Sequence, residues 1–245
     1  MERLAPRRAF SQGVARRWLG NLGMVPFDLL LVRVLFTAGS TLGLAVYCAR
    51  QEIGLFHALP APPPAPVQVA VGFVALDLCM WLQHWLQHKL PFLWRSHRVH
   101  HTDLDLDVTT AFRFHPFEAI YTVACRMVFI AAFGLPLAAV LLYEIALELT
   151  SSAAHASLRL PERLDAAARQ LVVTPDFHRV HHSARAPEMH RNFASVLSLW
   201  DRVFRTYQAQ PEKGHADMEL GLPGFRAPLH LLALLALPFR GSPGD

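Results

Sequence analysis

The sequence has few charged residues, few cysteines and no glycine-rich phosphate loop. Charged side chains make up 17% of its 245 residues, well below the roughly 25% of ordinary soluble domains. The three cysteines, Cys48, Cys79 and Cys125, have no paired spacing, so a disulfide framework is not expected. The basic residues are not clustered with aromatic ones in this apolar chain, which argues against a protein that binds nucleic acid.

The sequence contains long apolar runs with few charged residues. Three of them extend from Phe27 to Tyr47, from Val67 to Trp85 and from Ala119 to Leu149. A bilayer core needs about 20 apolar residues per helix, so each of the first two runs predicts one membrane-spanning helix. The third is too long for one helix, and Gly134-Leu135-Pro136 near its middle predicts a tight turn. A helical hairpin is therefore expected from about Phe117 to Ser157.

These runs predict an all-α integral membrane bundle of about four transmembrane helices, forming a single membrane domain over residues 1–245. A soluble helical protein with a large core is the alternative, but soluble helices of this length show a polar face and these mostly do not. A fourth apolar run, Leu229 to Leu237, is too short to span. It is expected to lie on the membrane surface or to cover the core.

Few charged residues interrupt the predicted spans. Asp28 and Arg33 are expected near a helix end, where their side chains can reach the interface. Arg126 and Glu144 fall on opposite arms of the predicted hairpin, so an ion pair between them is possible.

Charge asymmetry predicts the orientation in the membrane. Five arginines precede the first predicted span: Arg3, Arg7, Arg8, Arg16 and Arg17. The positive-inside rule then places the N-terminus in the cytoplasm. An arginine-rich start is also typical of a transit peptide, but no small-residue cleavage site follows a short apolar core. With four spans, every histidine-rich segment returns to the cytoplasmic side, where a histidine-rich helical cap is expected.

Three histidine clusters follow or end the predicted spans. They are His84-Trp-Leu-Gln-His88, His97-Arg-Val-His100-His101 and His178-Arg-Val-His181-His182. Rings three or four residues apart share one face of a helix. Thr174 and Pro175 predict an N-cap and a first helical position ahead of the third cluster. Converging imidazoles at this spacing are what a transition-metal site requires.

His155, at the end of the hairpin, is expected on the same side and completes nine candidate metal ligands. Nine imidazoles are too many for one ion, so two metals with four or five histidines each are expected. Residues that could add a ligand or orient the rings are His115, Asp77, Glu118, Asp176 and Asn192. For any one carboxylate, an orienting or structural role is favoured over direct ligation.

Other polar residues near the clusters are assigned no metal. His57, His215 and His230 stand outside the clusters, and the role of His190 is left open. Asp103, Asp105 and Asp107 resemble the start of a calcium loop but lack its glycine and closing glutamate, so a solvated turn is predicted.

The histidine pattern resembles the fatty acid hydroxylase and sterol desaturase superfamily of membrane-bound histidine-box enzymes. The resemblance runs from about Asp77 to Tyr207. Besides the clusters it includes five segments: 93–101 (LWRSHRVHH), 113–118 (RFHPFE), 155–161 (HASLRLP), 174–183 (TPDFHRVHHS) and 199–204 (LWDRVF). The last two distinguish the chain from acyl-CoA desaturases, whose histidine boxes have other surroundings.

This resemblance implies a di-iron, O2-dependent lipid oxidoreductase that hydroxylates or desaturates an unactivated C–H bond. It implies two Fe ions held by the histidines, with Zn possible in the isolated protein, O2 as co-substrate and a sterol, fatty acyl or related lipid as substrate. Electrons would come from a separate donor such as cytochrome b5, ferredoxin or a similar protein. Two rival readings use the same histidine cage, namely a zinc-binding membrane hydrolase and a non-enzymatic scaffold.

The chain departs from the family pattern outside the boxes. Ser157 stands where many members have asparagine, Asn192-Phe-Ala194 where many have Asn-Tyr-Gly, and Phe204-Arg-Thr206 where many have Phe-Gly-Thr. These changes spare the histidines and bear on substrate, loop geometry and donor docking.

Overall fold

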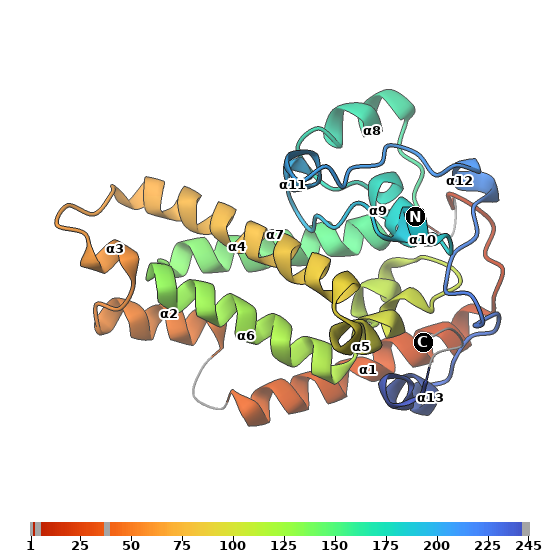
Figure 1. Cartoon of the computed structure of the whole chain (residues 1–245), viewed down its shortest axis with the longest axis horizontal. Coiled ribbons are helices and arrows are strands. Elements are labelled where there is room, and N and C mark those ends of the chain that lie inside the picture. Colours follow the sequence, from red (N-terminus) through yellow and green to blue (C-terminus); the bar gives the residue numbers. More distant parts are fainter. Residues whose placement is uncertain (1, 3–5, 37–39, 242–245) are drawn as a thin grey trace.

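The computed structural model describes residues 2, 6–36 and 40–241, and these contain helices and isolated β-bridges but no β-strand. Four helices are long and apolar enough to cross a membrane: α1 (Val14–Leu35), α4 (Ala65–Lys89), α6 (Pro116–Phe133) and α7 (Leu137–His155). The four run roughly along the long axis of the molecule (Figure 1). The predicted all-α membrane bundle is confirmed.

The hairpin from α6 to α7 forms as predicted. Gly134 ends α6 in the left-handed conformation at φ 66°, where a glycine carries no steric penalty. A Cβ atom at this position would lie 2.5 Å from the Ile53 carbonyl oxygen, so the close approach of the two loops also requires glycine. Across the hairpin, Arg126 Nη1 lies 2.6 Å from Glu144 Oε2, which is the expected ion pair.

The predicted first span, Phe27 to Tyr47, is wrong as a single helix. The spanning helix α1 begins at Val14, and a second helix, α2 (Thr41–Arg50), follows after a break. Ser40 starts α2 by accepting a hydrogen bond from the Gly43 N–H at 3.1 Å, and such caps define a new helix start. Asp28 consequently lies inside α1, away from its ends, while Arg33 lies in the last turn as predicted.

The early start of α1 is explained by ion pairs between Arg17 and two aspartates that follow α5. Arg17 is buried inside the helix and pairs with Asp103 at 2.7 Å and with Asp107 at 2.8 Å. Asp105 accepts hydrogen bonds from the Ser11 and Gln12 N–H groups at 3.0 and 2.9 Å. All three aspartates are at most 2% exposed. The prediction of a solvated turn for residues 103–107 is therefore wrong, because the N-terminal arm (residues 6–13) covers this segment. Arg3 of the same basic stretch lies outside the described residues.

The core of the bundle joins α2, α4, α6 and α7. Its buried apolar residues include Ala45, Leu76, Ile130 and Val140. Tyr143 lies fully buried among them and donates from its hydroxyl to Asp77 Oδ1 at 3.2 Å. Thr41 Oγ1 donates to Glu144 Oε1 at 2.9 Å, which ties α2 to α7.

Short helices form a cap at one end of the bundle (Figure 1). They are α5 (Pro91–His101), η1 (Val108–Phe112), α8 (Glu162–Ala168), α9 (Pro175–His181), α10 (Ala186–Met189), α11 (Leu199–Val203) and α12 (Gly214–Asp217). A four-residue helix, α3 (Leu55–Ala58), lies at the opposite end.

The fourth apolar run covers the core at the cap end. It forms α13 (Leu231–Ala236) and η2 (Leu237–Phe239). Leu234 and Leu237 are buried with Met24 of α1 and Val99 of α5, and Arg98 donates to the Leu237 carbonyl at 2.7 Å. The three cysteines are free, as expected.

Candidate metal centre

A bend between α4 and α5 places the first five histidines together. α4 ends at Lys89, Leu90 is extended, and Pro91 takes the first position of α5, where its missing N–H breaks no helical hydrogen bond. The last turns of α4 therefore lie against α5. Ring centroids are 4.8 Å apart for His84 and His97, and 4.9 Å apart for His88 and His101.

The distal histidines are positioned by α9. Thr174 Oγ1 accepts from the Phe177 N–H at 3.2 Å, and Pro175 is the first helical residue, as the sequence predicts. Phe177 and Val180 are fully buried and anchor one side of the helix. The other side carries His178 and His181, and His182 follows as the C-cap residue.

The nine predicted histidines gather into two groups. The first contains five (His84, His88, His97, His101 and His181), and the second contains four (His100, His155, His178 and His182). Within each group, one ring nitrogen from every histidine lies within 4.8 Å of the others, and all nine residues are buried. The two groups meet because His100 and His101 are neighbours on α5, and His181 and His182 are neighbours at the end of α9.

Hydrogen bonds fix the tautomers of three rings in the five-histidine group. The Nδ1–H groups of His84, His97 and His181 donate to Phe193 O at 2.7 Å, to Glu118 Oε1 at 2.7 Å and to Arg191 O at 2.8 Å. A neutral ring with its proton on Nδ1 carries a lone pair on Nε2. The Nε2 atoms of His84 and His97 lie 3.1 Å apart. Two lone pairs at that distance repel each other unless a cation lies between them.

The four-histidine group shows the same arrangement around His155. Its Nδ1–H donates to the Ser151 carbonyl at 2.7 Å, so its Nε2 carries a lone pair. That Nε2 lies 3.1 Å from His100 Nε2 and 3.0 Å from His178 Nε2. His182 Nε2 lies 3.1 Å from His178 Nε2.

These nitrogen positions fit a bound transition-metal ion in each group. A metal–imidazole bond is about 2.0–2.1 Å long, so two ligands at right angles around one ion lie about 3.0 Å apart. The observed separations of 3.0–3.1 Å match this spacing. His88 Nε2 and His181 Nε2 are buried and have no hydrogen-bond partner, whereas the Nδ1 atom of each is engaged. An inner nitrogen left without a partner is what a ligand requires.

The protonation state of the rings is also suited to a metal. Burial, followed by repulsion from neighbouring rings, holds the pKa well below its usual range for the cap histidines His97, His100, His101, His178, His181 and His182. These rings are therefore neutral near pH 7, and neutral imidazole is the form that binds metal.

The other predicted site residues lie apart, with one exception. Glu118 contacts a candidate ligand, His97. His115 caps α6 and its Nε2 lies 3.2 Å from the Leu235 carbonyl. Asp176 pairs with Arg7 at 2.9 Å, and Asn192 donates to the Phe177 carbonyl at 2.8 Å. His115, Asp176 and Asn192 thus contact α13, the N-terminal arm and α9 rather than the nine rings.

Asp77 and Asp201 stabilise the loop that orients His84. This loop contains Phe193, whose carbonyl accepts from the His84 ring. Asp77 Oδ2 accepts from Trp200 Nε1 at 2.9 Å and from the Leu197 N–H at 3.1 Å. Asp201 accepts from the N–H groups of Phe193 and Ala194 at 2.9 and 2.8 Å. The sequence analysis assigned no role to Asp201, although it lies in the segment 199–204 that carries the family resemblance.

His190, whose role the sequence left open, lies at the edge of the first group. Its Nδ1 is 3.3 Å from His88 Nδ1. Gln83 and Gln87 were also missed. They lie on α4 beside the first cluster and carry the hydrogen-bond network that continues from Glu118. Their helical spacing to His84 and His88 was the available signal.

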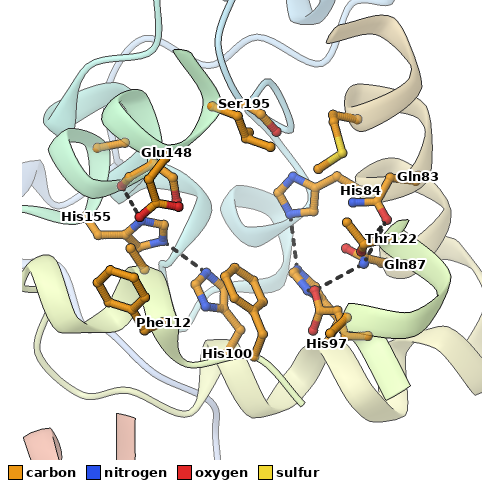
Figure 2. A pocket seen from close by; sticks show the side chains of 18 of the residues that line it. Gln83, His84, Gln87, His97, His100, Phe112, Thr122, Glu148, His155 and Ser195 are labelled. Carbon is orange, nitrogen blue, oxygen red and sulfur yellow. Dashed lines mark hydrogen bonds and ion pairs between the residues drawn. The ribbon is translucent and has the colours of Figure 1, made fainter. Parts of the chain in front are cut away.

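A cavity of about 310 Å³ lies against both histidine groups. Its wall includes His84 and His97 from the first group, and His100, His155 and His178 from the second. Figure 2 shows rings of both groups along this cavity, with Gln83, Gln87 and Thr122 on one side and Glu148 and Phe112 on the other. All four spanning helices contribute lining residues, among them Leu29, Met80, Val123 and Leu147.

The curated relatives of the chain are less than 30% identical to it over the aligned residues. An ornithine lipid hydroxylase of Rhizobium tropici is 27% identical over 211 residues, which cover 85% of this chain and 62% of that protein. The alkylglycerol monooxygenase of Homo sapiens is 25% identical over 147 residues, covering 58% and 31%. The enzyme of the same name from Caenorhabditis elegans is 29% identical over 140 residues, covering 55% and 26%. The chain thus spans between about a quarter and under two thirds of the length of these relatives.

No solved structure matches the chain significantly. The fatty acid hydroxylase family model matches residues 69–206, more than half of the chain. This range contains the nine candidate histidine ligands. It also contains Asp77 and Asp201, which hold the loop that orients His84. The family resemblance seen in the sequence is confirmed, and the chain belongs to the fatty acid hydroxylase family.

Proposed function

We propose that this protein is a membrane-bound, di-iron, O2-dependent lipid oxygenase that hydroxylates an unactivated C–H bond. The observation that carries the proposal is the cavity, which touches both histidine groups and is walled by all four spanning helices. A lipid entering between the helices would meet both metal positions without leaving the bilayer.

The nine histidines would hold the two ions, five rings around one and four around the other. Iron in these positions would supply the activation of O2 for attack on a C–H bond. The overall reaction balances as R–H + O2 + 2 e⁻ + 2 H⁺ giving R–OH + H2O. The two electrons would come from a separate donor, such as cytochrome b5, ferredoxin or a similar protein.

The protein's own part is to orient the rings, shape the cavity and exclude water. Hydrogen bonds fix the tautomers of four rings, with the acceptors being the carbonyls of Phe193, Arg191 and Ser151 and the carboxylate of Glu118. Such partners of the ligands strongly affect metal affinity. Apolar side chains such as Leu29, Val123 and Leu147 would hold a lipid chain in place.

The relatives support a hydroxylation rather than a desaturation. One is named as an ornithine lipid hydroxylase and two as alkylglycerol monooxygenases. All three names describe insertion of oxygen into a lipid. We therefore propose a polar lipid as substrate and a hydroxylated lipid as product.

The cap and the N-terminal arm would face the cytoplasm. The arm packs onto the cap through Arg7 and Asp176 and through Ser11 and Asp105, so both lie on one side of the membrane. The basic arm and the positive-inside rule favour the cytoplasmic side.

The test is metal analysis combined with oxygen uptake. The purified protein is expected to hold two iron ions per chain and, once reduced chemically, to consume O2 in the presence of a lipid extract with formation of a hydroxylated lipid. A protein that binds only zinc and is inert to O2 after reconstitution with iron would overturn the proposal and favour the hydrolase reading. A protein that binds no metal would favour the scaffold.

A further inference from the structure

Two half-buried rings, His190 and Trp94, lie between the five-histidine group and the surface of the cap. His190 Nδ1 is 3.3 Å from His88 Nδ1. The Trp94 ring centroid is 5.0 Å from that of His88 and 5.5 Å from that of His101. The centroids of Trp94 and His190 are themselves 6.4 Å apart. A molecule bound at this surface therefore touches rings that contact candidate metal ligands.

The exposed charges beside these two rings are all basic. In residues 88–95 and 190–205, the exposed charged side chains are Lys89, Arg95, Arg191 and Arg205. The one acid of these two segments, Asp201, is 0% exposed. None of the four cations forms an ion pair with another residue that the structure describes. Their positive charge is therefore left uncompensated by the chain itself.

The four cations belong to one surface, which we call the basic patch (Lys89, Arg95, Arg191 and Arg205). Three of them directly follow His88, Trp94 and His190 in the chain, the residues that are in mutual contact. The fourth is joined to the third, because Arg191 Nη1 donates to the Arg205 carbonyl at 2.9 Å.

The basic patch begins where a spanning helix ends. Lys89 is the last residue of α4, and charged side chains avoid the hydrocarbon core, so the patch faces water at the membrane surface. Phe92, three residues further on, is 70% exposed. Exposed aromatic and arginine side chains together are typical of surfaces that bind another protein.

We infer that the basic patch docks an acidic one-electron carrier protein and places its redox group against His190 and Trp94. A positive surface steers a negatively charged partner into the right orientation, and transient redox complexes need only a small interface. An anionic lipid headgroup would also suit the charge, but it would gain nothing from two rings that contact His88 and His101. The inference rests on the proposed function, for which it gives the docking site and the charge of the electron donor.

The electrons balance with two dockings per turnover. Each carrier is oxidised by one electron as the metal centre is reduced by one. Two carriers thus supply the two electrons consumed in R–H + O2 + 2 e⁻ + 2 H⁺, and the two protons come from water.

The first experiment is a zero-length cross-link, because the chain contains only two lysines, Lys89 and Lys213. Both are exposed, and Lys213 lies outside the patch at the start of α12. The protein in phosphatidylcholine nanodiscs is mixed with an acidic carrier, either the soluble domain of cytochrome b5 or a plant-type ferredoxin. A carbodiimide then joins lysine amines to carrier carboxylates, and mass spectrometry identifies the joined peptides. Cross-links are expected through Lys89 and not through Lys213.

The second experiment measures affinity by surface plasmon resonance on the same discs. The acidic carriers are expected to bind at least about tenfold more tightly than cytochrome c, a basic carrier. Raising the salt from about 50 to about 300 mM should weaken their binding, since exposed charges are screened.

Variants then locate the docking site. K89E/R95E is expected to weaken binding of the acidic carriers at least about tenfold. R50E/R163E makes the same change of charge at two exposed positions outside the patch and is the matched control, expected to bind like the unaltered protein. K89R keeps the charge, so it should retain the affinity while losing the cross-link.

Two results would overturn the inference. One is an affinity of both acidic carriers no higher than that of cytochrome c, and the other is cross-linking through Lys213 instead of Lys89. If the carriers do not bind and K89E/R95E instead lowers the phosphatidylglycerol that copurifies with the protein, the patch is a site for anionic lipid and the inference fails.

These measurements are separable from the test of the proposed function. Docking and cross-linking need neither O2 nor a lipid substrate, so their failure leaves the oxygen-uptake test with a chemical reductant standing. Inertness to O2 would in turn leave the docking result standing.

Discussion

At the scale of single residues, the second ring nitrogen of four histidines carries as much information as the first. Carbonyl or carboxylate oxygens hold the Nδ1–H of His84, His97, His155 and His181. Each ring then presents an Nε2 lone pair inward. Histidine spacing indicated a metal site, but the partners that select the tautomer lie 10, 21 and 109 residues away for His181, His97 and His84. For His155 the partner comes from its own helix.

Glu118 is expected to matter for metal affinity although it is not among the nine rings. E118Q keeps the shape of the side chain but removes the charge that stabilises the His97 N–H contact. We expect metal affinity to fall by about 10- to 100-fold, measured by competition with a coloured chelator. E162Q serves as the control, and unchanged affinity in E118Q would show that the carboxylate does not tune the site.

Single ligand substitutions should separate the two groups. H178A removes one of four rings, and we expect loss of one metal ion per chain while the five-histidine group keeps its ion, measured by elemental analysis of folded, detergent-solubilised protein. H230A is the matched control, because His230 is the N-cap residue of α13 and belongs to neither histidine group. Retention of both ions in H178A would contradict the ligand assignment.

At the scale of elements, buried charge explains the one span that the sequence placed wrongly. Apolar length alone starts the first helix near Phe27, whereas α1 starts at Val14. Arg17 is tolerated inside α1 because Asp103 and Asp107 reach it from the segment after α5. That pairing joins residues 86 and 90 positions apart, which no local pattern reveals.

Removing Arg17 should therefore destabilise the whole cap. R17A leaves two buried aspartates without their cation, and breaking a buried pair costs about 3–5 kcal/mol. We expect a clearly lower unfolding temperature in detergent, followed by intrinsic fluorescence. R16A, at the exposed neighbouring position, is the control. Equal unfolding temperatures for both variants would mean that the aspartates find other partners.

At the scale of the whole molecule, the two ends of the described chain gather at the cap. The N-terminal arm packs on the aspartate segment, and η2 packs on α5 through Arg98. Figure 1 shows the start of α1 and the helix α13 at this end of the bundle. The arm, the histidine groups and the C-terminal helices therefore lie at one end of the bundle.

The orientation can be measured with reporter fusions in a bacterial host. We expect a fluorescent protein fused to the C-terminus to fluoresce and alkaline phosphatase fused there to be inactive, because the proposed orientation places the cap in the cytoplasm. A phosphatase inserted between Pro60 and Pro66, at the opposite end, should be active and serves as the internal control. The reverse pattern would invert the topology.

The sequence by itself determined the membrane class, the hairpin at Gly134, the α9 cap at Thr174 and the nine clustered histidines, because these follow from apolar length, turn chemistry and helical spacing. Only the tertiary structure decided how the nine rings divide into five and four, since neighbours such as His100 and His101 point into different groups. It also decided that Glu118, rather than Asp77 or Asp176, reaches one of the nine rings. Those facts depend on which helices pack together, and packing joins residues whose separation along the chain carries no local signal.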